Sequence, residues 1–91
     1  MRGNQVSLHV QTGERITTTR AAVVVSKKVD KSAVRRNRIR RRVYEIFRTH
    51  HSQLKGPANL VFTVYNPDFT TMPAEEVQTA VLSLLKSAKL L

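Results

Sequence analysis

The stretch KKVDKSAVRRNRIRRRVYEIFR, from Lys27 to Arg48, is the most informative part of this 91-residue chain. It holds ten of the sixteen Lys and Arg residues and only two acids, so it carries a net charge of +8 against +10 for the whole chain. Charge of one sign at this density repels itself and destabilises a compact fold. A bound polyanion offsets that repulsion, so the sequence predicts a partner that is nucleic acid or an anionic surface.

The second half of this stretch has the spacing of an amphipathic helix. Its apolar residues fall at i, i+4, i+7 and i+8, which places them on one face; they are Ile39, Val43, Ile46 and Phe47. Asp30 or Ser32 can cap the helix by accepting a backbone N–H. We expect Arg35 and Arg36 to overhang the edge of the core, with Glu45 relieving Arg41 or Arg42.

The flanking segments predict a small sheet. Ser7–Val10 alternates polar and apolar residues, as a half-buried strand does. A turn at 12–15 leads into Ile16–Ser26, which we expect to be a second strand paired with the first. A third strand, Leu60–Tyr65, is followed by a helix starting at Pro73. The apolar stripe of this second helix is Val77, Val81, Leu84, Leu85 and Ala88.

The order strand, strand, helix, strand, helix predicts an α/β fold, an α+β two-layer sandwich with helices mainly on one face. Ninety-one residues make a single domain, 1–91, and a hydrophobic content of 41% is enough for a core. The chain has no Cys, and apolar runs such as Ala21–Val25 are far shorter than the roughly 20 residues of a membrane span. These features, with no signal peptide at the start, lead us to expect a cytoplasmic protein.

An arginine-rich helix start suits phosphate binding. The guanidinium group offers a planar fork that matches two phosphate oxygens. The helix N-terminus adds unpaired N–H groups and partial positive charge, and Asn37 can hold a neighbouring Arg, a base edge or a hydrated ion. A merely solvated surface helix is the weaker interpretation, because six Arg in the eight positions 35–42 disfavour a helix that has no partner.

These residues resemble the signature of the bacterial ribonuclease P protein subunit. The family pattern is a Val-Ser-Lys-Lys strand end, a short loop, and Arg-Asn-Arg-x-Lys-Arg opening a helix. This chain has Ser26-Lys27-Lys28-Val29, then Ala33-Val34, then Arg36-Asn37-Arg38-Ile39-Arg40-Arg41. The resemblance extends over the chain from about Gln5 to Leu91.

The resemblance implies a cofactor for a catalytic RNA that removes the 5′ leader from precursor tRNA. The protein is then one subunit of an endoribonuclease and is expected to be non-catalytic alone. Magnesium ions would be held mainly by the RNA, with none required by the protein itself. The family fold has a left-handed βαβ crossover, which departs from the usual handedness.

The resemblance also implies which residues bind RNA. The expected contacts to the catalytic RNA are Lys27, Lys28, Lys31, Arg35, Arg36, Asn37, Arg38, Arg40 and Arg41. The leader of precursor tRNA is expected in a cleft formed by Ser7, His9, Ala22, Val24, Ser26 and Tyr65. His9 stands where the family often has an aromatic residue and can still stack on a base.

Three features depart from the family pattern. The loop Asp30-Lys31-Ser32 replaces a shorter one with Gly, and Tyr44 occupies a position that is often basic. The family's N-terminal helix, which supplies Phe side chains to the cleft, has no counterpart in this sequence. We therefore expect normal anchoring to the catalytic RNA, a weaker leader cleft, and self-association through the uncovered sheet face.

Other functions remain as alternatives. A ribosomal-type structural RNA-binding protein fits the size and charge, but it does not require the Arg-Asn-Arg string. A membrane-surface helix needs a free apolar face, whereas this stripe is needed for the core. A stand-alone nuclease needs clustered carboxylates, and six acids are scattered along the chain. For His50 with His51, and for Asp68 with Glu75 and Glu76, helix-end roles are preferred over metal binding.

Overall fold

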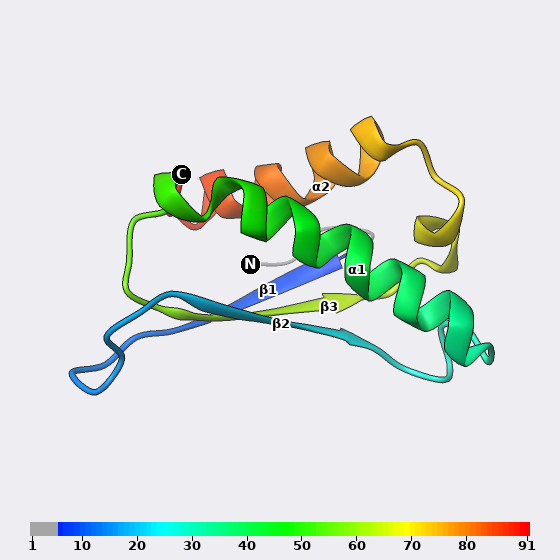
Figure 1. The fold of residues 1–91 in the computed structure, drawn as a ribbon, viewed down its shortest axis with the longest axis horizontal. Coiled ribbons are helices and arrows are strands. Elements are labelled where there is room, and N and C mark those ends of the chain that lie inside the picture. Colours follow the sequence, from blue (N-terminus) through cyan, green and yellow to red (C-terminus); the bar gives the residue numbers. More distant parts are fainter. Residues whose placement is uncertain (1–5) are drawn as a thin grey trace.

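The computed structural model describes residues 6–91, which fold into two layers, a sheet and a pair of helices (Figure 1). The strands are β1 (Val6–Gln11), β2 (Arg20–Val25) and β3 (Asn59–Val64). The helices are α1 (Ala33–His50) and α2 (Ala74–Ser87), with short 3-10 helices η1 (His51–Gln53) and η2 (Pro67–Thr70). The predicted fold class and element order are confirmed, although β2 starts at Arg20 rather than Ile16 and Pro73 lies just before α2.

The sheet order is β1-β3-β2, so the prediction that the first two strands pair with each other is wrong. β3 pairs antiparallel with β1 and parallel with β2, and Phe62 is the partner of both Leu8 and Val23. β3 buries Leu60, Phe62 and Val64 almost completely, which suits a central strand. The connection through residues 12–19 is long enough to pass the end of β3. β1 and β2, although consecutive in sequence, are therefore not neighbours in the sheet.

The crossover from β2 through α1 to β3 is left-handed. In Figure 1 both strands run to the right, α1 lies above them, and β2 lies nearer the viewer than β3. The chain therefore turns counter-clockwise as it moves away from the viewer. This handedness is the one that the family resemblance implied, and it is the rarer arrangement for parallel strands.

Both helices cover the same face of the sheet, α1 mainly over β2 and α2 over β1 (Figure 1). The predicted stripes form the core: Ile39, Val43 and Phe47 of α1 are buried, as are Val77, Val81, Leu84 and Leu85 of α2. Ile46 and Ala88 are partly buried against them. Within residues 6–91 no element covers the opposite face, which we call the open sheet face. Neither helix in this part of the chain combines the length and apolar character needed to span a membrane.

Candidate nucleic-acid interface

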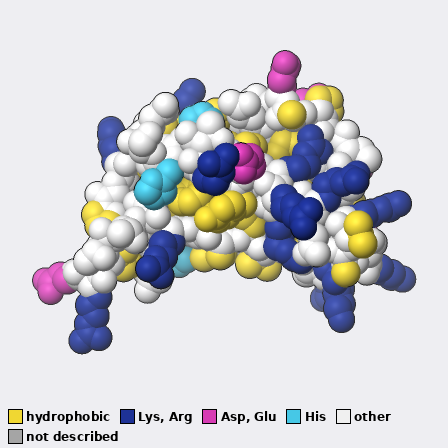
Figure 2. All heavy atoms as spheres, viewed as in Figure 1, with side chains coloured by type: hydrophobic (Ala, Val, Ile, Leu, Met, Phe, Trp, Pro, Cys, Tyr) yellow, Lys and Arg dark blue, Asp and Glu magenta, His cyan; other side chains and the backbone are white. Residues whose placement is uncertain are grey.

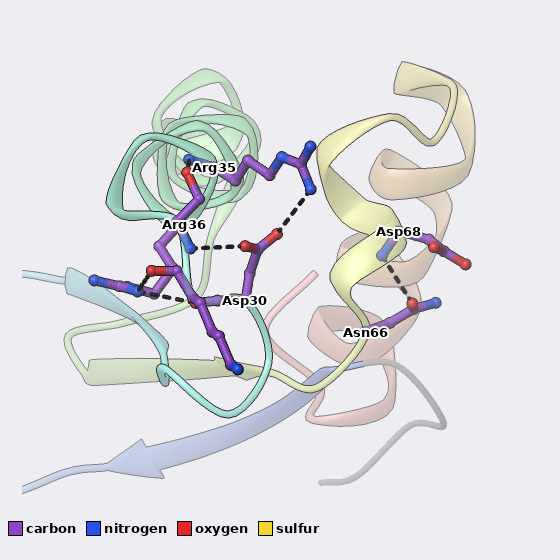
Figure 3. A network of polar contacts seen from close by, with 7 residues as sticks. Asp30, Arg35, Arg36, Asn66 and Asp68 are labelled. Carbon is purple, nitrogen blue, oxygen red and sulfur yellow. Dashed lines mark hydrogen bonds and ion pairs between the residues drawn. The ribbon is translucent and has the colours of Figure 1, made fainter.

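Hydrogen bonds of its own residues hold the loop between β2 and α1 against the start of the helix (Figure 3). The Ser32 hydroxyl accepts the Arg35 N–H at 3.3 Å and caps α1. Asp30 accepts the Ser32 N–H at 2.9 Å, and its side chain is only 11% exposed. Of the two candidate caps, Ser32 therefore caps the helix, while Asp30 holds the loop against the helix start.

Arg36 is turned inward rather than outward. Its Nη1 donates to the backbone carbonyls of Asp30 and Lys31, at 2.9 and 3.0 Å (Figure 3). The residue is partly buried, whereas we expected its side chain, like those of Arg38 and Arg40, to be exposed. The reason is that the longer loop folds back beneath the first turn and presents carbonyl groups that need donors.

The other predicted RNA-binding residues gather at one end of the molecule, at the close of β2 and along the first half of α1. Seven are exposed: Lys27, Lys28 and Lys31 precede the helix, and Arg35, Asn37, Arg38 and Arg41 lie on it. Arg35 lies 4.0 Å from a carboxylate oxygen of Asp30, a distant ion pair. Arg40 is partly buried and donates to the Asn37 side-chain oxygen. Figure 2 shows Lys and Arg side chains concentrated at this end.

Arg42 was not among the expected RNA-binding residues, and its side chain stabilises the fold. It donates from Nη1 to the Phe69 carbonyl at 2.7 Å and from Nη2 to the Met72 carbonyl. It thereby ties α1 to η2 and to the chain that leads into α2. The run of consecutive arginines does not predict this role, because the acceptor carbonyls come from η2 and the residues after it, far along the chain.

Glu45 pairs with Arg48, so the prediction that it relieves Arg41 or Arg42 is wrong. Arg48 donates from Nε to a Glu45 oxygen at 3.0 Å, and from Nη2 to the other oxygen. These hydrogen bonds lower the pKa of the Glu45 carboxyl and raise that of the Arg48 guanidinium. The arginines of the first half of α1 therefore keep their charge uncompensated by Glu45.

The open sheet face brings together the residues expected in the leader cleft: Ser7, His9, Ala22, Val24, Ser26 and Tyr65. Strand register places His9 and Ala22 on either side of Val61, and Ser7 and Val24 on either side of Thr63. The Tyr65 hydroxyl lies 3.0 Å from the Ser7 hydroxyl. Val24 and Tyr65 are 46% and 44% exposed, so this face presents apolar and aromatic surface to solvent.

Val61 and Thr63 complete this face and were not among the predicted residues. They stand four and two positions before Tyr65, and the alternation of a strand places all three on one side. The signal was therefore present in the sequence. The alternation alone does not place Val61 and Thr63 in the middle of this face. That position follows from β3 lying between β1 and β2.

The basic end and the open sheet face adjoin. Ser26 and the exposed Lys27 and Lys28 follow the last residue of β2, at the same edge as Tyr65 beyond β3. A long polyanion can therefore contact both surfaces. Among residues 6–91 no three His, Asp or Glu side chains come together as metal ligands would.

Comparisons with known proteins agree with this arrangement. The model of the family described as "Ribonuclease P" matches residues 1–89. A "Ribonuclease P protein component" from Pseudanabaena is 48% identical over 63 residues, covering 69% of this chain and 54% of the relative. One from Chloroflexus aurantiacus is 39% identical over 77 residues, covering 85% and 56%. The chain thus spans little more than half the length of these curated relatives.

Solved structures give the same picture of the fold. A Staphylococcus aureus RNase P protein superposes with a TM-score of 0.84 at 26% identity, covering 99% of this chain and 80% of that one. The RNase P protein from Thermotoga maritima gives a TM-score of 0.83 at 23% identity, covering 96% and 80%, and supports the fold alone.

Proposed function

This chain belongs to the ribonuclease P protein family, and we propose that it binds the catalytic RNA of ribonuclease P and assists removal of the 5′ leader from precursor tRNA. The observation that carries the proposal is the exposed basic cluster at the start of α1. Most of this charge is uncompensated, because Glu45 pairs with Arg48, and Asp30 accepts from the loop and lies 4.0 Å from Arg35 alone.

The residues of the cluster take two roles. Lys27, Lys28, Lys31, Arg35, Arg38 and Arg41 are exposed and can reach phosphates directly. Arg36 and Asn37 position their neighbours, since Arg36 holds the loop and Asn37 accepts from Arg40. Phosphate contacts of this kind fix a protein on RNA without reading sequence.

The leader of precursor tRNA is assigned to the open sheet face. His9, Val24 and Tyr65 offer exposed ring and apolar surface on which unpaired bases can stack. The same surface leads us to expect weak self-association when no RNA is bound.

Cleavage chemistry is assigned to the RNA partner. Within residues 6–91 no three His, Asp or Glu side chains lie together as metal ligands would. Magnesium in the complex would then be held by RNA, and the protein would act through binding and electrostatics. The isolated protein is expected to leave RNA intact at any magnesium concentration.

The test is reconstitution. The protein is added to a ribonuclease P RNA and precursor tRNA at a magnesium concentration too low for the RNA alone, and 5′ cleavage is measured. We expect cleavage with the native protein and with Lys86→Ala, a control on α2, but strongly reduced cleavage with Arg38→Ala/Arg41→Ala. Equal inactivity of all three proteins would contradict the proposal and favour the ribosomal-type alternative.

The assignment of the leader needs a second substrate. Precursor tRNA with a long leader is compared with tRNA lacking one, for native protein and Tyr65→Ala. A loss confined to the long-leader substrate is expected. An equal loss on both substrates would mean that the open sheet face does not hold the leader. Prepending an aromatic-containing family helix should strengthen binding of the long-leader substrate selectively.

A further inference from the structure

A second exposed tyrosine lies away from the open sheet face. Tyr44 is 45% exposed, on the outer side of α1 where the helix overhangs β2. It separates two hollows of about 340 and 380 Å³ that share Ala21 and Tyr44 in their walls. Together they form a groove along α1 and β2, which we call the α1–β2 groove. Each half is large enough for a small ligand.

Arginines line this groove on both sides of the tyrosine. One hollow includes Arg40 and Arg41, and the other includes Arg20 and Arg48. Arg40, Arg41 and Arg48 stand four and three positions before Tyr44 and four after it, so they neighbour it on the helix surface. In the described part of the chain, no hydrogen bond or ion pair engages the side chain of Arg41. Figure 2 shows apolar surface between α1 and β2 with basic side chains beside it.

The ring of Tyr44 is supported from within. Its centroid lies 5.6 Å from that of Phe47 at an interplanar angle of 48°, and Phe47 in turn contacts His51 edge-on at 5.5 Å. Phe47 is buried, so the tyrosine rests on the core. A ring held in this way loses little freedom when a planar group stacks on its exposed side.

We infer that the α1–β2 groove binds a single-stranded RNA segment, with one unpaired base stacked on Tyr44 and the adjoining phosphates on Arg40 and Arg41. Aromatic rings beside arginines are the usual means of holding unpaired strands. The base must be unpaired, because a duplex keeps its base faces stacked. Charge selects this occupant over an extended peptide added along the outer edge of β2, since the arginines of the groove favour a polyanion.

This site is distinct from the proposed leader cleft. Tyr44 belongs to α1, which covers one face of the sheet (Figure 1). The Tyr65 hydroxyl lies at Ser7 on the opposite, open face, so one base cannot contact both rings. The inference shares with the proposed function the premise that the partner is RNA and the phosphate contact of Arg41, whereas stacking on Tyr44 belongs to the inference alone. It needs neither the catalytic RNA nor tRNA, so the two fail separately.

The experiment uses a short unstructured RNA oligonucleotide that contains one 2-aminopurine, whose fluorescence reports stacking. Native protein is compared with Tyr44→Ala, with Tyr44→Phe, and with Tyr65→Ala, which reports stacking on the open sheet face instead. Lys86→Ala on α2, outside both proposed RNA surfaces, is the control. Melting is followed for each, and binding is measured where all are folded. We expect Tyr44→Phe to retain affinity within about 2-fold. Tyr44→Ala should lose about 5- to 150-fold in affinity, together with the fluorescence change.

Salt dependence separates stacking from charge. Tyr44→Ala should keep the native slope of log affinity against log salt, whereas Arg41→Ala should make it shallower by roughly 1. Unchanged binding of Tyr44→Ala would overturn the inference, and so would a fluorescence change that is lost only in Tyr65→Ala. A lower melting temperature of Tyr44→Ala with native affinity in the folded state would show that Tyr44 merely covers the core.

Discussion

The two helices cover the same face of one sheet, yet they differ in the charge that they present to solvent. Their inner faces are alike, each with a buried apolar stripe. Their charges differ. Of the seven Arg of α1, Arg35, Arg38, Arg41 and Arg48 are exposed beside a single Glu, whereas α2 carries Glu75, Glu76 and Lys86. The acids of α2 lie in its first turn, where they suit the helix dipole. The inner faces therefore specify the fold, and we propose that the outer face of α1 binds the partner.

The largest expected effect of this difference is the salt dependence of RNA binding. If five to seven of the exposed basic side chains reach phosphates, log affinity should fall against log salt with a slope of roughly −4 to −6. Between 50 and 200 mM salt this amounts to a loss of about 250- to 4,000-fold. A filter-binding titration measures it. A slope shallower than about −2 would mean that the outer face of α1 is not the interface.

The inner faces should govern stability in both helices. Ile39→Ala and Leu85→Ala each leave a cavity in a fully buried position, so each should lower the free energy of unfolding by roughly 2–4 kcal/mol. Urea denaturation followed by circular dichroism measures both losses. Arg38→Ala, one position from Ile39, is the control and should leave unfolding nearly unchanged. Stable Ile39→Ala with unfolded Arg38→Ala would show that the faces of α1 are assigned the wrong way round.

Two adjacent arginines should separate the two roles within α1. Arg42→Ala removes the donors to the Phe69 and Met72 carbonyls, so it should cost about 1.5–3 kcal/mol of stability. Arg41→Ala should cost roughly 1–3 kcal/mol of binding to the catalytic RNA with little change in stability. Paired melting and binding measurements on both variants test this. The same pattern in both would contradict the separation.

Arg36 should combine both effects. Arg36→Ala leaves the carbonyls of Asp30 and Lys31 without their donor, so we expect a lower melting temperature as well as weaker RNA binding. Calorimetry and RNA titration of Arg36→Ala beside Arg38→Ala measure the contrast. If Arg36→Ala melted like the native protein, the loop would not depend on the side chain.

The Glu45–Arg48 pair should have the smallest effect, because exposed ion pairs contribute little. The pKa of Glu45 is lowered in the folded state, so its contribution is present above the unfolded-state pKa and is lost as pH falls through the folded-state value. Glu45→Gln should therefore change the melting temperature slightly at neutral pH and not at all in strong acid. A large change at neutral pH would show a further role for Glu45.

The sequence by itself determined the elements, the two buried stripes and the basic end. These follow from local periodicity and from the order of residues such as Arg36 to Arg41, which a helix displays in the same way in any fold. Asp30 and Ser32 as candidate helix caps, and the alternation that separates Ser7 and His9 from Leu8 and Val10, are local for the same reason.

Only the tertiary structure decided which strands pair and what each arginine does. The place of β3 between β1 and β2, and hence the role of Val61 and Thr63, depends on contacts between segments far apart in the chain. Arg36 and Arg41 look alike in sequence, but Arg36 meets loop carbonyls and Arg41 meets solvent. The acceptors that distinguish Arg42 from Arg41 lie 27 and 30 residues away, and no local pattern brings them there.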